Sequence, residues 1–174
     1  MNILVIGSGA REHAIVRALK RSPKEKEIFC LGSNVNPGIA ELCADLAVVN
    51  INDTHTITSY AKKRAVDLAI IGSENPLAVG AADVLWGEGI KVVGPRKDLA
   101  QIETSKAFTR DLLTEYNISG CPKYKTFSSL SGVEEFLDEL GENYVVKYDG
   151  LAGGKGVKVS GDHLHSHDDA KIYC

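Results

Sequence analysis

The stretch Met1-Asn-Ile-Leu-Val-Ile-Gly-Ser-Gly-Ala-Arg-Glu-His13 decides the class of fold. Residues 2–6 form a short continuous apolar run, which predicts a strand that is buried on both faces. A glycine turn follows at Gly7 and Gly9, and residues 12–20 carry apolar side chains at helical spacing. A buried strand, a tight turn and an amphipathic helix in this order indicate a parallel α/β sheet.

The same alternation of apolar runs and amphipathic stretches continues to about residue 100. We predict further strands and helices here, namely strands at 27–31, 46–49, 68–71 and 90–93 and helices near 56–64 and 76–86. Strands rich in Ile, Val and Leu that alternate with helices favour a doubly wound α/β domain with both faces of its sheet covered.

The rhythm changes after Gly94-Pro95. A helical stretch over 98–116 leads to Gly120-Cys-Pro122, which interrupts the chain as a linker would. Beyond it the pattern predicts a smaller α+β region with the following elements: a strand at 123–127, a helix opened by Ser131 with Glu134 in a capping box, strands at 144–148 and 156–160, and a helix with Ser166 as its N-cap.

A glycine-rich loop, Asp149-Gly-Leu-Ala-Gly-Gly-Lys-Gly-Val157, separates the last two predicted strands. Glycine lets backbone N–H groups approach an anion and permits positive φ angles, and a lysine on the same loop adds a mobile positive charge. These properties suit a flexible cover for phosphates. A glycine-rich hairpin without a ligand is the alternative interpretation.

The turn after the first strand is a second candidate site, because ligands of doubly wound sheets bind at the carboxyl ends of the strands. A nicotinamide dinucleotide fits poorly, since Glu12 replaces the third glycine of the fingerprint and Gly32-Ser-Asn34 lacks the acidic residue that would hold the ribose. Arg11 and Glu12 could also be helix-start residues without a ligand.

A third cluster, Gly72-Ser-Glu-Asn-Pro-Leu77, follows the predicted strand at 68–71. The Glu74 carboxylate could accept hydrogen bonds from ribose hydroxyls or from an amine. A carboxylate that caps the next helix is the alternative.

The composition limits the kinds of partner. The chain has 174 residues, 20 basic and 23 acidic side chains and a formal charge of −3, without a basic block. This balance argues against nucleic acid or an anionic membrane surface. The sequence has no apolar run that would span a membrane, no recognisable signal peptide and four scattered cysteines, so we expect free thiols and a cytoplasmic protein.

Five motifs together carry a resemblance to the phosphoribosylamine–glycine ligases, also called glycinamide ribonucleotide synthetases, of the ATP-grasp superfamily. The chain resembles the N-terminal part of this family from Met1 to about its end, in the order Gly7-Ser-Gly-Ala-Arg-Glu-His13, Gly72-Ser-Glu-Asn-Pro-Leu77, Gly94-Pro95, Glu103-Thr-Ser-Lys106 with Phe108, and Val145-Val-Lys-Tyr-Asp-Gly-Leu-Ala-Gly-Gly-Lys-Gly-Val157. Tyr148 and Gly153 depart from the alanines expected in many relatives, but neither change removes a charge or a glycine that the loop needs.

The resemblance implies an activity and a set of ligands. The family joins glycine to 5-phosphoribosylamine and makes glycinamide ribonucleotide, ADP and phosphate, a step of purine biosynthesis. The residues that match ATP-binding positions are Lys106, Lys147, Gly150, Gly153, Gly154, Lys155, Gly156 and Val157, and those assigned to phosphoribosylamine are Gly7, Gly9, Arg11, Glu12 and Glu74. The implied domains are a substrate-binding, Rossmann-like domain (1–103), a helical linker (104–121) and the first part of an ATP-grasp domain (122–174).

Length is the larger departure, since family members are more than twice as long. We expect the Mg²⁺ ligands, the adenine-holding hinge and most of the catalytic residues outside these residues, in which no carboxylate cluster suits Mg²⁺. The chain is then an inactive fragment of an enzyme that acts on small molecules, with a monomer as a plausible state. Another ATP-grasp carboxylate–amine ligase and a non-catalytic nucleotide-binding module are the alternatives.

Overall fold

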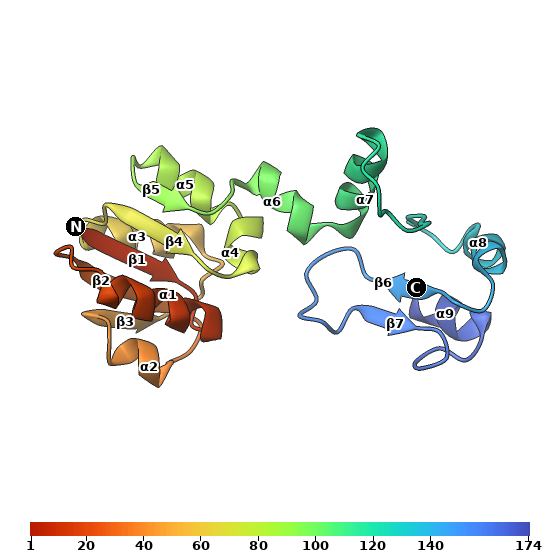
Figure 1. The fold of residues 1–174 in the computed structure, drawn as a ribbon, viewed down its shortest axis with the longest axis horizontal. Coiled ribbons are helices and arrows are strands. Elements are labelled where there is room, and N and C mark those ends of the chain that lie inside the picture. The colour runs from red at the N-terminus through yellow and green to blue at the C-terminus, as the bar shows by residue number, and fades with distance from the viewer. The chain divides into compact units, whose positions relative to one another are not determined.

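The computed structural model describes residues 1–174, which divide into two compact units, Met1–Gln101 and Ile102–Cys174. We call them the N-terminal unit and the C-terminal unit (Figure 1). Each unit has a hydrophobic core of its own. No helix in either unit is both long enough and apolar enough to cross a membrane.

The N-terminal unit is built on a five-stranded parallel sheet. Its strands are β1 (Asn2–Ile6), β2 (Glu27–Gly32), β3 (Asp45–Val48), β4 (Leu68–Ile71) and β5 (Lys91–Val93), in the spatial order β3-β2-β1-β4-β5. The chain runs outward from β1 to β3 and then returns to the other side of β1. The doubly wound α/β fold that the sequence predicts is confirmed.

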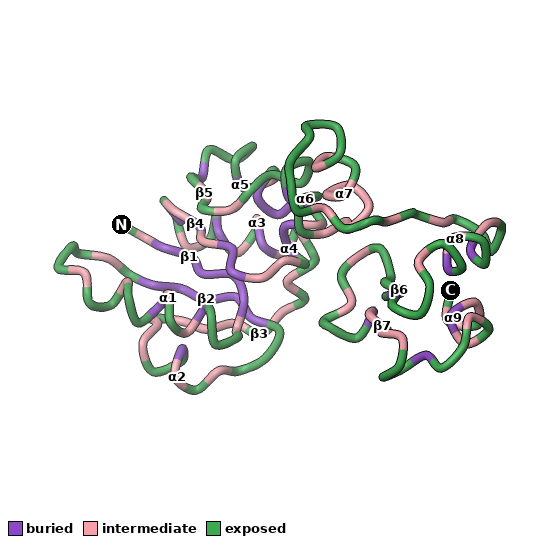
Figure 2. Tube along the Cα trace, turned by 45° about the vertical axis from the view of Figure 1, so that its right-hand side comes forward, coloured by how far each residue is buried: buried purple, intermediate pink, exposed green.

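Helices cover both faces of this sheet. They are α1 (Ala10–Arg21), α2 (Pro37–Ala40), α3 (Thr54–Lys63), α4 (Glu74–Ala78) and α5 (Ala81–Gly87). Helix α6 (Lys97–Thr104) follows β5 and adds Ala100 to the core. Successive β1 side chains point to opposite faces, so Leu4 packs in a core with α3 and α5, whereas Val5 packs in a second core with α1 and α2. The buried strands form the centre of the unit in Figure 2.

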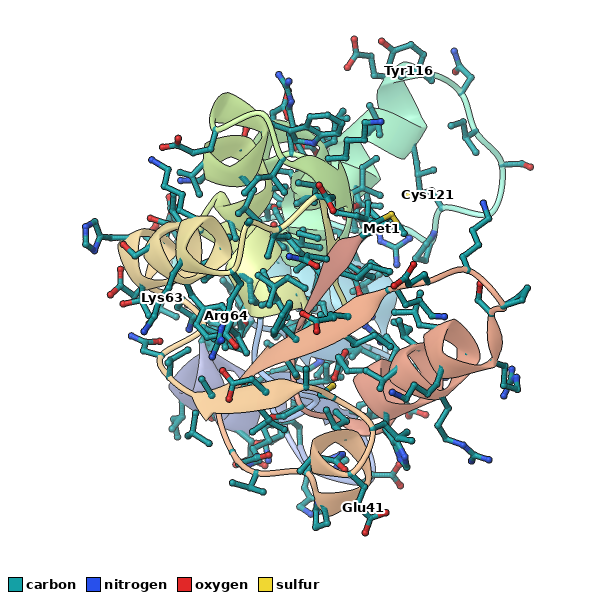
Figure 3. All side chains as sticks on the ribbon, turned by 90° about the vertical axis from the view of Figure 1, so that its left-hand side faces the viewer. Met1, Glu41, Lys63, Arg64, Tyr116 and Cys121 are labelled. Atoms are coloured by element: carbon teal, nitrogen blue, oxygen red, sulfur yellow. The ribbon has the colours of Figure 1, made fainter.

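The edge strand β3 is tied to α3 by a polar cluster. The Tyr60 hydroxyl donates to the Asp45 carboxylate at 2.8 Å, and the guanidinium of Arg64, which follows α3 (Figure 3), pairs with the same carboxylate. Arg64 also lies 5.3 Å from the centre of the Phe29 ring. The hydrogen bond from Tyr60, assisted by Arg64, lowers the pKa of Asp45.

Two long helices predicted from the sequence are broken in the structure. The segment 76–86 belongs to α4 and α5, because Gly80 lies between them with φ +88°. The segment 98–116 likewise belongs to α6 and to α7 (Lys106–Glu115), with Ser105 extended at φ −129° as the N-cap of α7. The short helix α2 is capped by the Asn36 side chain, which accepts the Ile39 N–H.

The C-terminal unit combines α7, α8 (Val133–Leu140) and α9 (His167–Tyr173) with an antiparallel pair of strands, β6 (Val145–Lys147) and β7 (Val157–Val159). Its core consists of residues from α8, α9 and the segments between them, namely Val133, Leu137, Tyr144, Leu164 and Ala170. The expected small α+β region is therefore present.

Two local predictions for this unit were wrong. Residues 123–127 form no strand, because the only ladder in this unit joins β6 to β7 and no neighbouring strand supplies hydrogen bonds to them. Helix α8 is preceded by Gly132 at φ +77° as its N-cap, and not by Ser131. Ser166 is the N-cap of α9 as predicted, since its hydroxyl accepts from Asp169 N–H at 3.1 Å.

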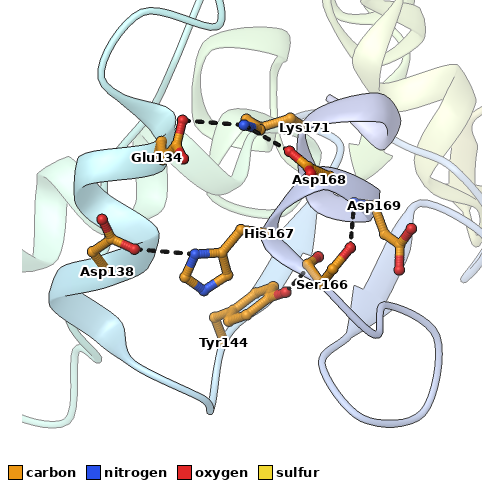
Figure 4. A network of polar contacts seen from close by, with 8 residues as sticks. All are labelled: Glu134, Asp138, Tyr144, Ser166, His167, Asp168, Asp169 and Lys171. Carbon is orange, nitrogen blue, oxygen red and sulfur yellow. Dashed lines mark hydrogen bonds and ion pairs between the residues drawn. The ribbon is translucent and has the colours of Figure 1, made fainter.

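A polar network joins α8 to α9 (Figure 4). His167 Nδ1 lies 3.1 Å from Asp138, and Lys171 lies 3.1 Å from Glu134. The Tyr144 hydroxyl donates to a backbone carbonyl at the start of α9 at 3.0 Å. Exposed ion pairs of this kind stabilise only modestly, so they add to the apolar contacts of a small core.

Candidate functional site

The loops after β1 and β4 meet at the carboxyl edge of the N-terminal sheet. Gly7 N–H donates to the carbonyl of Leu31 at 2.8 Å, and Gly72 N–H donates to the carbonyl of Ile6 at 3.0 Å. The strand order reverses between β1 and β4, and such a switch point is where open α/β sheets bind ligands. The structure thus brings together the second and third candidate clusters of the sequence, the turn at Gly7–His13 and the segment Gly72–Leu77.

Glu12 fills the space between these glycines. The residue is only 4 % exposed, and its carboxylate accepts the N–H of Gly9 at 2.6 Å. A Cβ atom added to Gly72 would lie 2.1 Å from Glu12 Oε1, and one added to Gly7 would lie 2.7 Å from its side chain. Glu12 therefore caps its own helix and occupies the place where a dinucleotide pyrophosphate would approach the turn.

Arg11 and Glu74 form the open part of this site. Arg11 Nη1 donates to the Gly72 carbonyl at 2.6 Å and lies 3.2 Å from Glu74 Oε1. Their side chains are 63 % and 34 % exposed, so both are accessible to a ligand. Asn36 Nδ2 donates to the Ser8 carbonyl at 3.0 Å, so the start of α2 supports the same edge of the sheet.

Beneath the turn lies a buried thiol. Cys30 Sγ donates to the Gly7 carbonyl at 3.3 Å, and burial raises its pKa to about 12. Burial also raises the pKa of Cys43 to about 11. Both thiols are therefore protonated near neutral pH and act as packing groups.

The glycine-rich loop of the C-terminal unit has a fixed base and an open tip. Tyr148 N–H donates to the Gly156 carbonyl at 2.8 Å, and a Cβ atom on Gly156 would lie 2.7 Å from the Ala152 Cβ. At the tip, Gly153 and Gly154 have φ angles of +54° and +78°, and nothing lies within 4 Å of a Cβ atom added there. Glycine thus permits close packing at the base and left-handed backbone at the tip.

Lys106 reaches the beginning of this loop. Its ammonium donates to the Gly150 carbonyl at 2.8 Å. The Asp149 carboxylate in turn accepts the backbone N–H groups of Lys106 at 2.6 Å and Ala107 at 3.1 Å. Asp149 was not predicted as a site residue, because no spacing pattern indicates that a loop residue contacts a helix start 43 residues earlier.

A cavity of about 1530 Å³ lies in the C-terminal unit beside the loop. Its lining includes four of the predicted nucleotide-binding residues, namely Lys106, Lys147, Lys155 and Gly156. Lys147 is exposed at the end of β6, opposite Val157 of β7. Gly150 joins this group through its contact with Lys106, whereas Gly153 and Gly154 lie at the loop tip and do not line the cavity.

The volume exceeds the roughly 300–1,000 Å³ of typical small-molecule pockets, so the cavity is a broad groove with room for a nucleotide. The basic side chains and glycine amides offer the donors that phosphate oxygens require. No group of three or more His, Cys, Asp or Glu side chains is placed to hold a metal ion. The lysines and glycine amides therefore suit the phosphates of a nucleotide.

A doubly wound sheet followed by an α+β unit with lysines beside a glycine-rich loop defines a protein of the ATP-grasp class. Residues 1–103 match the family described as "Phosphoribosylglycinamide synthetase, N domain", and residues 104–171 match "Phosphoribosylglycinamide synthetase, ATP-grasp (A) domain". The chain belongs to the phosphoribosylglycinamide synthetase family.

Similar proteins extend this finding. The phosphoribosylamine–glycine ligase of Methanosarcina barkeri is 44 % identical over 173 residues, which cover 99 % of this chain and 40 % of the relative. The phosphoribosylamine–glycine ligase of Methanococcus vannielii is 50 % identical over 178 residues, covering 100 % of this chain and 40 % of that relative. The chain thus spans about two fifths of the length of these relatives.

Solved structures agree on the fold. The phosphoribosylamine–glycine ligase of Thermotoga maritima has a TM-score of 0.73 at 23 % identity, covering 99 % of this chain and 38 % of that one. An N5-carboxyaminoimidazole ribonucleotide synthetase, solved as an ADP complex, has a TM-score of 0.76 at 19 % identity, covering 99 % of this chain and 44 % of that one. At these identities the likeness concerns the fold alone.

Proposed function

We propose that this chain supplies the N-terminal part of a phosphoribosylamine–glycine ligase, a cytoplasmic enzyme that joins glycine to 5-phosphoribosylamine and cleaves ATP to ADP and phosphate. The observation that carries the proposal is the groove in which Lys106, Lys147 and Lys155 lie beside a glycine-rich loop. The family membership and the names of the relatives support the choice of reaction.

In this proposal the groove binds the ATP phosphates. Phosphoryl transfer depends mainly on positioning and on neutralising charge, which ammonium groups and backbone amides supply. Lys106 and Lys147 neutralise the phosphates, and the loop from Gly150 to Val157 closes over them with Lys155. The open space around Gly153 and Gly154 supports this role, because it leaves the tip free to move.

We assign phosphoribosylamine to the edge of the N-terminal sheet. The exposed Arg11 guanidinium suits the sugar phosphate, and the Glu74 carboxylate suits ribose hydroxyls or the amine. Gly7 and Gly9 allow the backbone to approach the ligand. Glu12 is buried, so in this proposal it shapes the turn from beneath.

The remaining parts of the reaction need residues outside these 174. We propose that the Mg²⁺ ligands, the adenine hinge and the glycine site lie there. Residues 1–174 alone then do not catalyse the reaction. We retain 1–103 as the substrate-binding domain, 104–121 as a helical linker and 122–174 as the first part of the ATP-grasp domain. Another ATP-grasp carboxylate–amine ligase is the second candidate, favoured only by the fold shared with other synthetases.

The nucleotide site is tested by Lys147→Met in an enzyme of the family's full length that carries this sequence. This change keeps the stem and removes the charge. The apparent KM for ATP should rise by about 10- to 150-fold, the scale of hydrogen bonds to charged groups, or turnover should be lost. The melting temperature should change little, because Lys147 is exposed.

Lys91→Met is the matched control, since Lys91 is an exposed strand lysine in the N-terminal unit. It should leave the KM for ATP unchanged. A loss of stability with normal ATP affinity in Lys147→Met would show instead that Lys147 is structural.

The acceptor site is tested by Glu74→Ala, with separate titrations of ATP, NAD and a stable phosphoribosylamine analogue. Affinity for the analogue should fall by about 10- to 150-fold while ATP binding stays unchanged. Tight NAD binding, or undiminished binding of the analogue, would overturn this assignment.

A further inference from the structure

We infer that Asp149 is a positioning residue for nucleotide binding. It holds Lys106 and the base of the glycine-rich loop in a fixed position relative to each other. The inference rests on the nucleotide site proposed above. It adds a residue that touches no nucleotide in this proposal and acts through the two elements that do.

The first observation is that the Asp149 carboxylate accepts hydrogen bonds from the start of α7. Its Oδ1 atom accepts the N–H groups of both Lys106 at 2.6 Å and Ala107 at 3.1 Å, and the Ser105 hydroxyl lies 3.1 Å from Oδ2. Free N–H groups at a helix start ordinarily seek an acceptor, and a negative charge is favourable there. Because Asp149 uses these donors, the start of α7 serves as an attachment point for the loop.

The second observation is that the neighbouring residue holds the other end of Lys106. The Gly150 carbonyl accepts the Lys106 ammonium at 2.8 Å, while Asp149 accepts its backbone N–H. Two consecutive loop residues thus fix both the main chain and the charged end of one lysine. This places the ammonium at the base of the loop that is proposed to cover the phosphates.

The third observation is the contrast between the base and the tip of the loop. The base is closed by the Asp149 contacts and by the bond from Tyr148 N–H to the Gly156 carbonyl. Gly153 and Gly154 have no atom within 4 Å of an added Cβ. At the tip the only backbone bond is the turn bond from Lys155 N–H to the Ala152 carbonyl. The tip turn can therefore move toward a ligand while the base keeps its contacts with Lys106.

An ordinary helix cap elsewhere in the chain provides a matched control. Asp53 caps α3 in the same way, because its Oδ1 accepts His55 N–H at 3.0 Å and Thr56 N–H at 3.3 Å. Asp53 belongs to the N-terminal unit, whereas the glycine-rich loop belongs to the C-terminal unit. A purely structural role for Asp149 would make the two alanine variants equivalent.

The experiment compares Asp149→Ala, Asp149→Asn and Asp53→Ala in the full-length enzyme, by titration with a non-hydrolysable ATP analogue. Asp149→Ala should raise the Kd at least about tenfold, because small misplacements of binding groups are costly. Asp149→Asn should recover most of this affinity, since its amide oxygen can replace Oδ1 as acceptor. Asp53→Ala should lower the melting temperature and leave the Kd unchanged.

Hydrogen exchange supplies a structural readout that does not depend on nucleotide binding. The amides of Lys106 and Ala107 should exchange faster in Asp149→Ala than in the wild type. Unchanged nucleotide affinity together with exposed amides would overturn the inference. If the alanine variant does not fold, Asp149→Glu decides, because it keeps the charge and displaces the carboxylate; unchanged affinity in that variant would also overturn it.

Failure of the proposed function gives a different result. In that case the wild type itself does not bind the analogue, so the nucleotide site and the positioning role are both rejected. When the wild type binds and Asp149→Ala binds equally well, only the inference about Asp149 fails.

Discussion

The two glycine-rich turns of this chain use glycine for opposite purposes. Around Gly7 and Gly72 the missing Cβ atoms make room for the buried Glu12 side chain, which a Cβ on Gly72 would meet at 2.1 Å. Around Gly153 and Gly154 nothing lies within 4 Å of an added Cβ, and both residues have positive φ angles. The first turn is therefore built for close packing, and the tip of the second is built for conformational freedom.

A glycine motif therefore does not by itself reveal its physical role. The turn after β1 is held by backbone bonds and by a carboxylate from its own helix. The loop between β6 and β7 is held at its base, and across its tip there is one turn bond, from Lys155 N–H to the Ala152 carbonyl at 3.0 Å. Substitutions in the turn after β1 should therefore change the free energy of unfolding. Ligand binding should instead change the conformation of the loop between β6 and β7.

The largest expected effect is that of Glu12→Ala. It leaves the Gly9 N–H without its acceptor and opens a cavity among the glycines, so the free energy of unfolding of the N-terminal unit should fall by about 2–4 kcal/mol. Urea unfolding can be followed by the fluorescence of Trp86, the single tryptophan, which lies in α5. Glu74→Ala is the control and should cost about 1 kcal/mol or less, because its ion pair with Arg11 is exposed. Equal losses would show that Glu12 is not the packing residue described here.

Gly72→Ala should have the next largest effect. The new Cβ would overlap Glu12 Oε1, and Glu12 cannot move away without losing its bond to Gly9, so we expect a loss of about 1–3 kcal/mol. Gly87→Ala is the control in the same unit, because nothing lies within 4 Å of an added Cβ there, and its effect should stay within about 0.5 kcal/mol. The same Trp86 measurement compares them, and a harmless Gly72→Ala would contradict the close packing.

A smaller effect is expected when a nucleotide orders the loop. In the full-length enzyme, a non-hydrolysable ATP analogue should slow amide exchange over residues 151–155 about tenfold, equivalent to about 1.4 kcal/mol. The Gly7 amide, which already donates to the Leu31 carbonyl, should not change. Exchange measured by mass spectrometry with and without the analogue tests this contrast. An unprotected loop at saturating analogue would refute it.

The smallest effect concerns acid stability at Asp45, away from both turns. Its folded-state pKa lies below the ordinary value of 3.8, so its contribution is present above that value and is lost as the pH falls through the folded-state pKa. In Asp45→Asn the N-terminal unit should therefore lose less of its free energy of unfolding on acidification than the wild type does. The difference should be less than about 1 kcal/mol, because the carboxylate is partly exposed to solvent. Denaturation by urea at pH values from about 5 to 2.5 would measure it, and identical pH profiles of variant and wild type would contradict it.

The sequence predicted the N-terminal sheet well, because each strand is a short apolar run. Such a run can be recognised without knowing which residues far away in the sequence pack against it. Helix breaks were harder to predict. Helical periodicity continues across Gly80 and Ser105, whereas the backbone at those two residues leaves the helical region. The predicted strand at 123–127 failed for another reason, since a strand needs a neighbour and its own pattern cannot supply one.

The residues of the candidate sites also differ in whether the sequence could predict them. The glycines and lysines were recognisable from residue type and order, and the structure places Lys106, Lys147 and Lys155 around one groove. Asp149 was not recognisable, because its contact with α7 depends on folding and not on spacing. The burial of Glu12 could not be foreseen either, because a carboxylate at a helix start is usually exposed.

The burial of Cys30 has a practical consequence for labelling chemistry. Maleimides and similar reagents attack thiolates, and Cys30 and Cys43 have pKa values raised to about 12 and about 11. The other two cysteines, Cys121 and Cys174, both belong to the C-terminal unit. Cys121 is half-buried like Cys43, whereas Cys174 is exposed, although partial burial raises its thiol pKa as well. A fluorescent or spin probe added near neutral pH should therefore attach first at Cys174, the one exposed thiol. A probe on Cys174 would then report on the unit that contains the glycine-rich loop.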